Sequence, residues 1–187
     1  KEEIPLSRNK IKLFEKGIYY IVGELSEDSL APVIEDLLLK IDNPPKDLKQ
    51  ITLVISSLGG ELYATMGLIN LLEIQKLPVR TIGLGSCFSA AAMLLASGTK
   101  GMRSAARSTA IMVHQFSTHM EGTATQLAVG GSFARGEYDR YLQFFIDHSR
   151  YRNKKQIEKY LVKDVDTWIT TNEAIKHGLV DKVFTRF

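Results

Sequence analysis

Three apolar runs, each leading into glycine and then into a helical pattern, most constrain what this chain can fold into. The runs 18–22, 51–56 and 79–84 are rich in β-branched residues, as is a later run, 109–114. Short runs of this kind, bounded by turn residues, are typical of buried strands. The stretches 26–41, 61–76 and 89–97 follow the first three runs and have helical spacing of apolar residues. This repeated order of strand and helix predicts an α/β fold with largely parallel strands.

The second half of the chain is expected to be mostly helical. One long helix is predicted at 123–150, followed by a helix near 154–162, a short segment at 166–169 and a last helix at 170–177. The long helix carries five aromatic residues, Phe133, Tyr138, Tyr141, Phe144 and Phe145. So much apolar surface on one helix needs a partner surface, for which another subunit is a candidate. The pair Gly130-Gly131 interrupts this helix and predicts a kink or a mobile segment.

Composition narrows the classes of function. The 24 Lys and Arg against 21 Asp and Glu leave a net charge of +3 and form no basic stripe, so nucleic acid is not an expected partner. A single cysteine, Cys87, excludes an intrachain disulfide and a zinc site of several cysteines. This suits a reducing compartment, or simply a fold that needs no disulfide, and the expected location is the cytoplasm. No apolar run is long enough to span a membrane, and the start Lys1-Glu2-Glu3 is not that of a signal peptide.

Ser89 stands at a predicted strand-to-helix transition, in the segment Gly85-Ser86-Cys87-Phe88-Ser89-Ala90. The amide groups and dipole of a helix N-terminus favour negative charge that develops nearby, so this serine is a candidate nucleophile. A serine at such a place is more often an N-cap, and both interpretations stay open for Ser89 taken alone.

Two further features fall at the ends of predicted strands. His114 ends the strand 109–114, and Gly59-Gly60 end the strand that begins at residue 51. Paired glycines expose backbone N–H groups, although a tight turn explains them equally well. Because α/β sheets collect functional groups at the carboxyl ends of their strands, one cleft is expected to hold Ser89, His114 and the glycine pair.

In this order and spacing, Ser-Leu-Gly-Gly, Gly-Ser-Cys-Phe-Ser-Ala and Met-Val-His-Gln resemble the three signatures of the ClpP family of ATP-dependent serine peptidases. The resemblance covers about 11–183, including the segment 43–47 and the region 173–181. It implies that Ser89 is the nucleophile and His114 the general base. The family's acidic residue corresponds to Asp166, which would orient the histidine, with Asp164 as the alternative.

The resemblance also implies a mechanism that needs no cofactor or metal. Backbone N–H groups of Gly60 and Ala90 would form the oxyanion hole. Cys87 and His119 are rivals for the nucleophile and the base. Cys87, however, lies on the approach to the helix, and His119 lies past the strand in a polar stretch.

The implied architecture is a crotonase-like spiral of strand-turn-helix units with a protruding handle helix. It forms one peptidase domain, 1–187, with a head at about 11–122 and 151–187 and the handle at about 123–150. The implied assembly is a homo-oligomer of two stacked heptameric rings that degrades unfolded protein or peptides. An AAA+ unfoldase of the ClpX or ClpA type would supply the substrate.

Several positions depart from the family pattern. Leu58 and Phe116 replace prolines, Phe88 replaces a small residue, and Val165 replaces an arginine that couples ring contacts to the catalytic residues. A divergent member encoded by a phage or plasmid would fit these changes. The alternatives are a structural ring subunit that has lost activity, a crotonase-fold acyl-CoA enzyme, and a membrane-anchored signal peptide peptidase with a lysine base.

Overall fold

The computed structural model describes residues 7–187, and the opening residues Lys1, Glu2 and Glu3 lie outside this part. The helices are α1 (Arg8–Glu15), α2 (Glu27–Asp42), α3 (Leu62–Ile74), α4 (Ala90–Ala96), α5 (Ala124–His148), α6 (Lys154–Tyr160) and α7 (Thr171–His177). The strands are β1 (Ile18–Leu25), β2 (Ile51–Gly60), β3 (Val79–Phe88), β4 (Arg103–Ala106), β5 (Ala110–Val113), β6 (Thr167–Ile169) and β7 (Lys182–Phe184). The predicted α/β class is confirmed.

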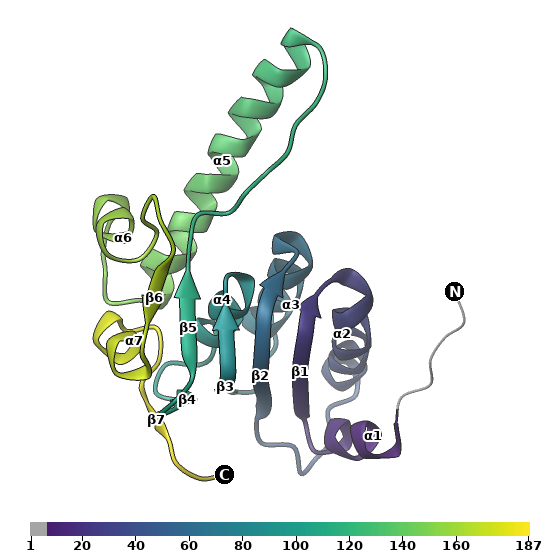
Figure 1. Ribbon diagram of the computed structural model, residues 1–187. Helices are drawn as coiled ribbons and strands as arrows, with labels where there is room; N and C mark the ends of the chain where they lie inside the picture. The colour runs from purple at the N-terminus through teal and green to yellow at the C-terminus, as the bar shows by residue number, and fades with distance from the viewer. Residues whose placement is uncertain (1–6) are drawn as a thin grey trace.

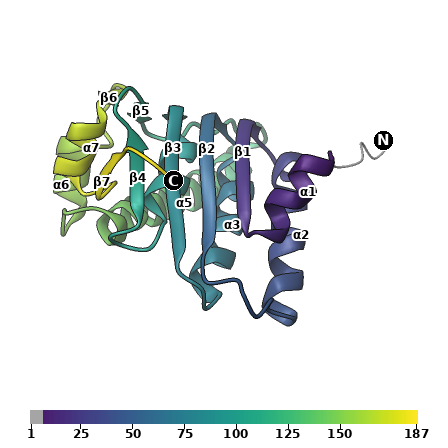
Figure 2. The same ribbon diagram turned by 90° about the horizontal axis from the view of Figure 1, so that it is seen from below.

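The strands form one sheet whose main path runs β1-β2-β3-β4-β7, with β5 paired to β3 and β6 paired to β5. All pairs are parallel except the antiparallel pair of β5 and β6. In Figure 1, α2, α3 and α4 lie behind the sheet, and α5 projects beyond the end to which the strands point. Figure 2 shows α1 and α2 beside β1, with α6 and α7 at the opposite end of the sheet.

Strand β3 changes partner along its length. Its first half, at Thr81 to Gly83, pairs with β4, and its second half, at Ser86 to Phe88, pairs with β5. The carboxyl ends of β3 and β5 therefore lie side by side, and the residues that follow these strands are brought together at one edge.

Helix α5 joins the head through its last turns. Tyr141, Phe144 and Phe145 are buried in the core of the same chain, whereas Phe133 stays exposed. The expectation that a second subunit covers the aromatic surface is thus wrong for these three residues, because their spacing points them at the head. The helix continues through Gly130 and Gly131 without a break, and mobility at this pair stays a prediction.

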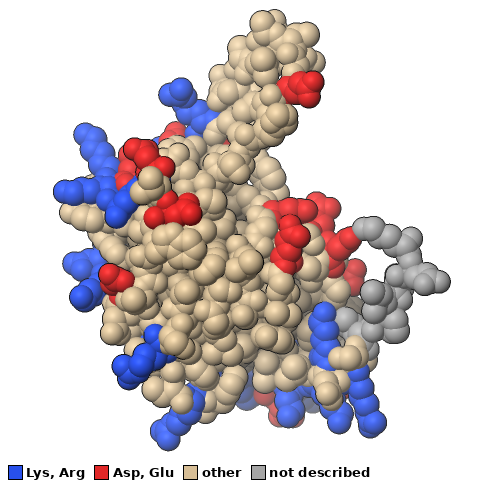
Figure 3. All heavy atoms as spheres, in the orientation of Figure 1, with Lys and Arg blue, Asp and Glu red and all other residues tan. Residues whose placement is uncertain are grey.

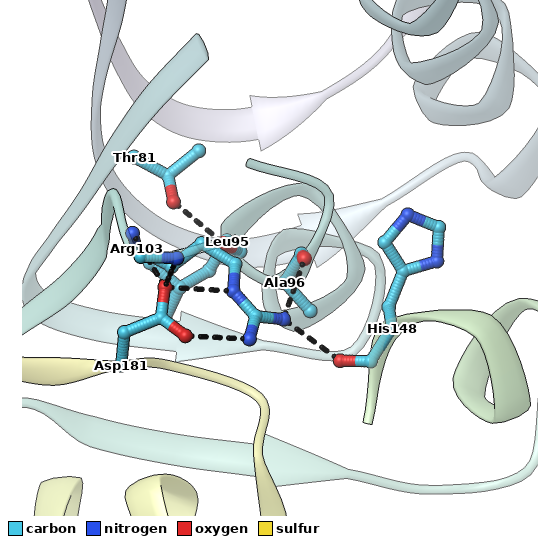
Figure 4. A network of polar contacts seen from close by, with 7 residues as sticks. Thr81, Leu95, Ala96, Arg103, His148 and Asp181 are labelled. Carbon is cyan, nitrogen blue, oxygen red and sulfur yellow. Dashed lines mark hydrogen bonds and ion pairs between the residues drawn. The ribbon is translucent and has the colours of Figure 1, made fainter. Parts of the chain in front are cut away.

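A buried arginine fixes the base of α5 to the head, as Figure 4 shows. The guanidinium of Arg103 donates to the carbonyl oxygens of Ala96 at 3.2 Å and His148 at 2.8 Å, which end α4 and α5. It also donates to both carboxylate oxygens of Asp181. A buried guanidinium needs such complete pairing, so this network ties β4, α4, α5 and the approach to β7 into one unit.

Three elements were not predicted from the sequence: α1, β4 and β7. Predicted element boundaries agree elsewhere within a few residues. The last helix has Thr170 as its N-cap and the left-handed Gly178 as its C-cap.

Candidate active site

Ser89 occupies a strained turn between β3 and α4. Its φ of 55° and ψ of −123° make it the one non-glycine residue among 7–187 with a positive φ. Its backbone N–H donates to the carbonyl oxygen of Met112 at 2.8 Å, which fixes the turn against β5. Ser89 stands at the N-cap position of α4, but its side chain makes no capping hydrogen bond to the helix, so its hydroxyl is not used as a cap. Strain of this kind persists only where surrounding contacts enforce it, and it concentrates at functional sites.

His114 follows the last residue of β5 and faces the serine. Its Nε2 lies 2.8 Å from the hydroxyl oxygen of Ser89, within hydrogen-bond distance. Its carbonyl oxygen accepts a hydrogen bond of 2.6 Å from the hydroxyl of Tyr141 on α5. Burial raises the pKa of Tyr141, so this phenol stays protonated and remains a donor at neutral pH. The backbone of the histidine is thereby attached to the long helix.

Asp166 lies on the other side of the histidine. In the antiparallel pairing Val113 stands opposite Thr167, so one further step places His114 opposite Asp166. The Nδ1 atom of His114 and the Oδ1 atom of Asp166 are 3.8 Å apart, a separation of an ion pair and longer than a hydrogen bond. Asp164 instead accepts a long hydrogen bond, of 3.4 Å, from the side chain of Gln115.

The glycine pair ends β2 beside the serine. Gly59 and Gly60 have φ values of 99° and 152°, and a Cβ atom on Gly60 would stand 2.1 Å from the carbonyl oxygen of Leu25. Only glycine fits this approach of β2 to β1. Ala90 is the first residue of α4, whose first amide groups lack partners within the helix.

Ser89, His114, Gly60 and Ala90 all line one cavity of about 530 Å³. Apolar side chains make up much of its remaining wall, from α3, α4, α5 and the segment after β5: Leu62, Tyr63, Met93, Phe116, Met120, Phe133 and Tyr141. Such a volume, with a few polar groups converging on one side, is typical of a site for a small molecule or a few residues of peptide. The structure thus brings four of the five predicted site residues to one cavity, with Asp166 behind the histidine.

The rival residues lie elsewhere. Cys87 is fully buried, and burial raises the pKa of its thiol to about 12. A thiol of this pKa is protonated at neutral pH and is a poor nucleophile. His119 is exposed and is not among the residues that line the cavity. Ser89 and His114 are therefore the better-placed pair.

Two contacts near the site were not predicted. One is the hydrogen bond of Tyr141 to His114, which the sequence could have indicated, since Tyr141, Phe144 and Phe145 have the spacing of a buried helix face. The other is an edge-to-face pair of Phe88 and Trp168, with ring centroids 4.9 Å apart. The sequence gave no sign of the contact between Phe88 and Trp168, because this contact depends on the register of β3, β5 and β6.

Residues 7–187 contain neither a metal-binding cluster nor a membrane-spanning helix. Within residues 7–187, no three or more His, Cys, Asp or Glu side chains are grouped so that they could hold a metal ion. None of the helices in that range has the length and apolar character needed to cross a membrane.

Comparison with known proteins relates this chain to a family and to a curated relative. The family model described as Clp protease matches residues 6–187. Among curated proteins, the chain is similar to the ATP-dependent Clp protease proteolytic subunit 2 of Bifidobacterium longum (strain NCC 2705). The two are 29% identical over 174 residues, which cover 93% of this chain and 82% of the relative.

Proposed function

Since this chain belongs to the Clp protease family, we propose that it is a serine endopeptidase in which Ser89 attacks the scissile peptide carbonyl. The observation that carries the proposal is the 2.8 Å contact between the Ser89 hydroxyl and Nε2 of His114, at a strained turn that opens on a cavity. Nucleophile and base within hydrogen-bond reach are the signature of an activated serine.

The mechanism follows from the roles of the three side chains. His114 removes the proton of the Ser89 hydroxyl as the oxygen attacks, and returns it to the leaving amine when the acyl-enzyme forms. Water then attacks the acyl-enzyme by the same route in reverse and releases the second product. Asp166 holds the imidazole in the required tautomer and stabilises the imidazolium across their 3.8 Å separation.

The oxyanion of the tetrahedral intermediate is held by backbone N–H groups of Gly60 and Ala90, which line the same cavity as Ser89. Losing one donor of this kind costs about 10²–10³ in rate. The absence of a side chain at Gly60 supports this role, because a Cβ atom there would clash with the backbone of Leu25 and displace the amide group.

We extend the proposal to assembly. The relative is named as a proteolytic subunit of an ATP-dependent protease, and the exposed end of α5 carries Leu127, Val129 and Phe133. We propose a single peptidase domain, with head and handle as predicted, that assembles through α5 into two stacked heptameric rings in the cytoplasm. An AAA+ unfoldase of the ClpX or ClpA type would deliver unfolded substrate.

The test is covalent labelling with a fluorophosphonate, which reacts with activated serines. Wild-type protein is expected to be labelled on Ser89, as located by peptide mass spectrometry, and Ser89→Ala is expected to be unlabelled. His114→Ala should retain the serine but lose labelling, because the base is missing. Labelling that persists in Ser89→Ala would refute the assignment. No labelling of assembled wild type would favour the alternative of a structural ring subunit.

A further inference from the structure

Helix α5 presents one face to the cavity that contains Ser89. The α5 residues that line this cavity are Gly130, Phe133, Ala134, Glu137 and Tyr141. They are three or four positions apart, which places them along a single face of the helix. Glu137 is the one charged side chain in this row, in the midst of apolar and neutral neighbours.

The carboxylate of Glu137 is largely buried, and its partner is an exposed arginine. Its side chain is only 10% exposed and forms an ion pair with Arg140, whose own side chain is 71% exposed. The contact uses Oε1 of Glu137 and Nη2 of Arg140, and this oxygen has almost no exposed surface. Because the guanidinium of Arg140 is largely exposed, its pairing with Glu137 competes with water, and a cation bound in the cavity can compete for the same carboxylate.

Arg140 lies outside the cavity of Ser89. It lines an adjoining cavity of about 280 Å³, of which Glu137 is also a wall, but it does not line the cavity of Ser89. Glu137 is therefore part of the wall around a ligand beside Ser89, whereas Arg140 is not.

The Ser89 cavity has the opposite charge to the chain as a whole. Its described lining includes the carboxylates of Glu27, Glu61 and Glu137 and contains no lysine or arginine, although the chain has a net charge of +3. In Figure 3 one group of acidic side chains lies on the right of the molecule near α2, whereas acidic and basic side chains are mixed on the left. Glu27 and Glu61 are exposed, and a carboxylate oxygen of Glu61 accepts the backbone N–H of Glu27 at 3.2 Å. Glu137 is thus the acidic group placed to act at close range.

These features fit a long side chain with a cationic end. The apolar walls at Leu62, Met93 and Phe133 can cover a methylene stem, and the carboxylate beyond them can pair with the terminal charge. Resting on the proposed peptidase function, we propose that Glu137 is a specificity residue that selects peptides with lysine or arginine next to the scissile bond.

The test compares fluorogenic peptides that differ only in the residue on the amino side of the scissile bond: lysine, norleucine, glutamine or glutamate. Norleucine matches the stem of lysine without its charge. Wild type is expected to cleave the lysine peptide with a kcat/KM about tenfold above that of the norleucine peptide, the size of one charge-assisted hydrogen bond. The glutamate peptide should be the poorest substrate, and added salt should narrow the differences.

Three variants separate Glu137 from general charge effects. Glu137→Gln should bring the lysine-to-norleucine ratio to within about twofold. Asp139→Asn removes the same charge from the same helix, where Asp139 pairs with Lys154 at 2.7 Å outside the cavity, and should keep the wild-type ratio. Arg140→Gln removes the competing cation and should raise the ratio. A wild-type enzyme that prefers norleucine, or a ratio unchanged in Glu137→Gln, overturns the inference.

A binding measurement distinguishes failure of this inference from failure of the peptidase assignment. In Ser89→Ala, fluorescence anisotropy of the uncleaved lysine and norleucine peptides should show the same order of affinity as the cleavage rates. If neither wild type nor variant is active yet lysine binds more tightly, the selectivity stands and the catalytic proposal fails. If both peptides bind equally, or neither binds, the role of Glu137 is refuted whatever the activity.

Discussion

His114 and Asp166 face each other across the antiparallel pair of β5 and β6, with Nδ1 and Oδ1 3.8 Å apart. The side chain of Asp166 is half exposed, so water competes for its carboxylate, and closure to hydrogen-bond distance requires only a small movement of either side chain. The imidazole is closer to the nucleophile, at 2.8 Å from the Ser89 hydroxyl.

The first prediction concerns this pair. Asp166→Asn is expected to lower kcat by about 10²–10⁴, because the imidazole loses its orienting group and the charge that stabilises the imidazolium. Peptide hydrolysis under saturating substrate measures the effect. Asp164→Asn is the matched control, since Asp164 contacts Gln115, and its kcat should stay near wild type. A larger loss of kcat in Asp164→Asn than in Asp166→Asn would show that Asp164, and not Asp166, orients the histidine.

The second prediction concerns the edge-to-face contact of Phe88 with Trp168. It connects the strand before Ser89 to the strand after Asp166, so Phe88→Leu should lower kcat more than it changes KM and should destabilise the fold by about 0.5–1.5 kcal/mol. Trp168 is the single tryptophan, so its fluorescence emission reports the loss of contact directly.

The control for that change is Phe187→Leu, which removes an aromatic pair of similar geometry, Phe184 with Phe187 at 5.1 Å, near the end of the chain. Its kcat and the emission of Trp168 should remain those of wild type. Equal effects of the two substitutions would show that Phe88 contributes only to stability.

The third prediction concerns the competing nucleophile. Cys87 is buried with a pKa of about 12, so iodoacetamide should not modify it in the folded protein and should modify it in denaturant. Cys87→Ala should keep fluorophosphonate labelling and peptide hydrolysis, at a modest loss of stability from the small cavity created. Loss of labelling in a correctly folded Cys87→Ala variant would contradict the placement of the nucleophile at Ser89.

The fourth prediction concerns stability at low pH. Burial acts to raise the pKa of Asp181, but the hydrogen bonds and charge of Arg103 outweigh it and lower this pKa below its ordinary value of 3.8. A lowered folded-state pKa means that the carboxylate stabilises the fold above pH 3.8 and that this stabilisation is lost as the pH falls through the folded-state value.

Asp181→Asn should therefore destabilise the protein at pH 7, since Arg103 is left buried without its charge partner. The difference in free energy of unfolding between wild type and variant should shrink below about pH 4, as measured by urea denaturation across pH 3–7. A difference that is constant across this range would exclude the ion pair as its cause.

Most helices and strands of the fold could be predicted from the pattern of neighbouring residues in the sequence. The strands β1, β2 and β3 could be predicted because each contains a run rich in β-branched residues, and the N-cap and C-cap of α7 could be predicted from Thr170 and Gly178. Strand β4 could not, because Arg-Ser-Ala-Ala has no strand pattern of its own and is extended only through pairing with β3 and β7. At such positions, contacts with neighbouring strands determine the conformation more strongly than the strand propensity of the residues does.

The active site likewise has features that could be predicted from the sequence and features that could not. The sequence by itself determined that Ser89, His114 and Gly60 would meet, because residues at the carboxyl ends of neighbouring parallel strands share one edge of the sheet. Only the tertiary structure decided that the Ser89 hydroxyl turns to His114 and does not cap α4, that Cys87 is buried, and that α5 adds Glu137 to the wall of the cavity. These outcomes depend on strand register and on the packing of α5 against the head, which are set by contacts between residues far apart in the sequence.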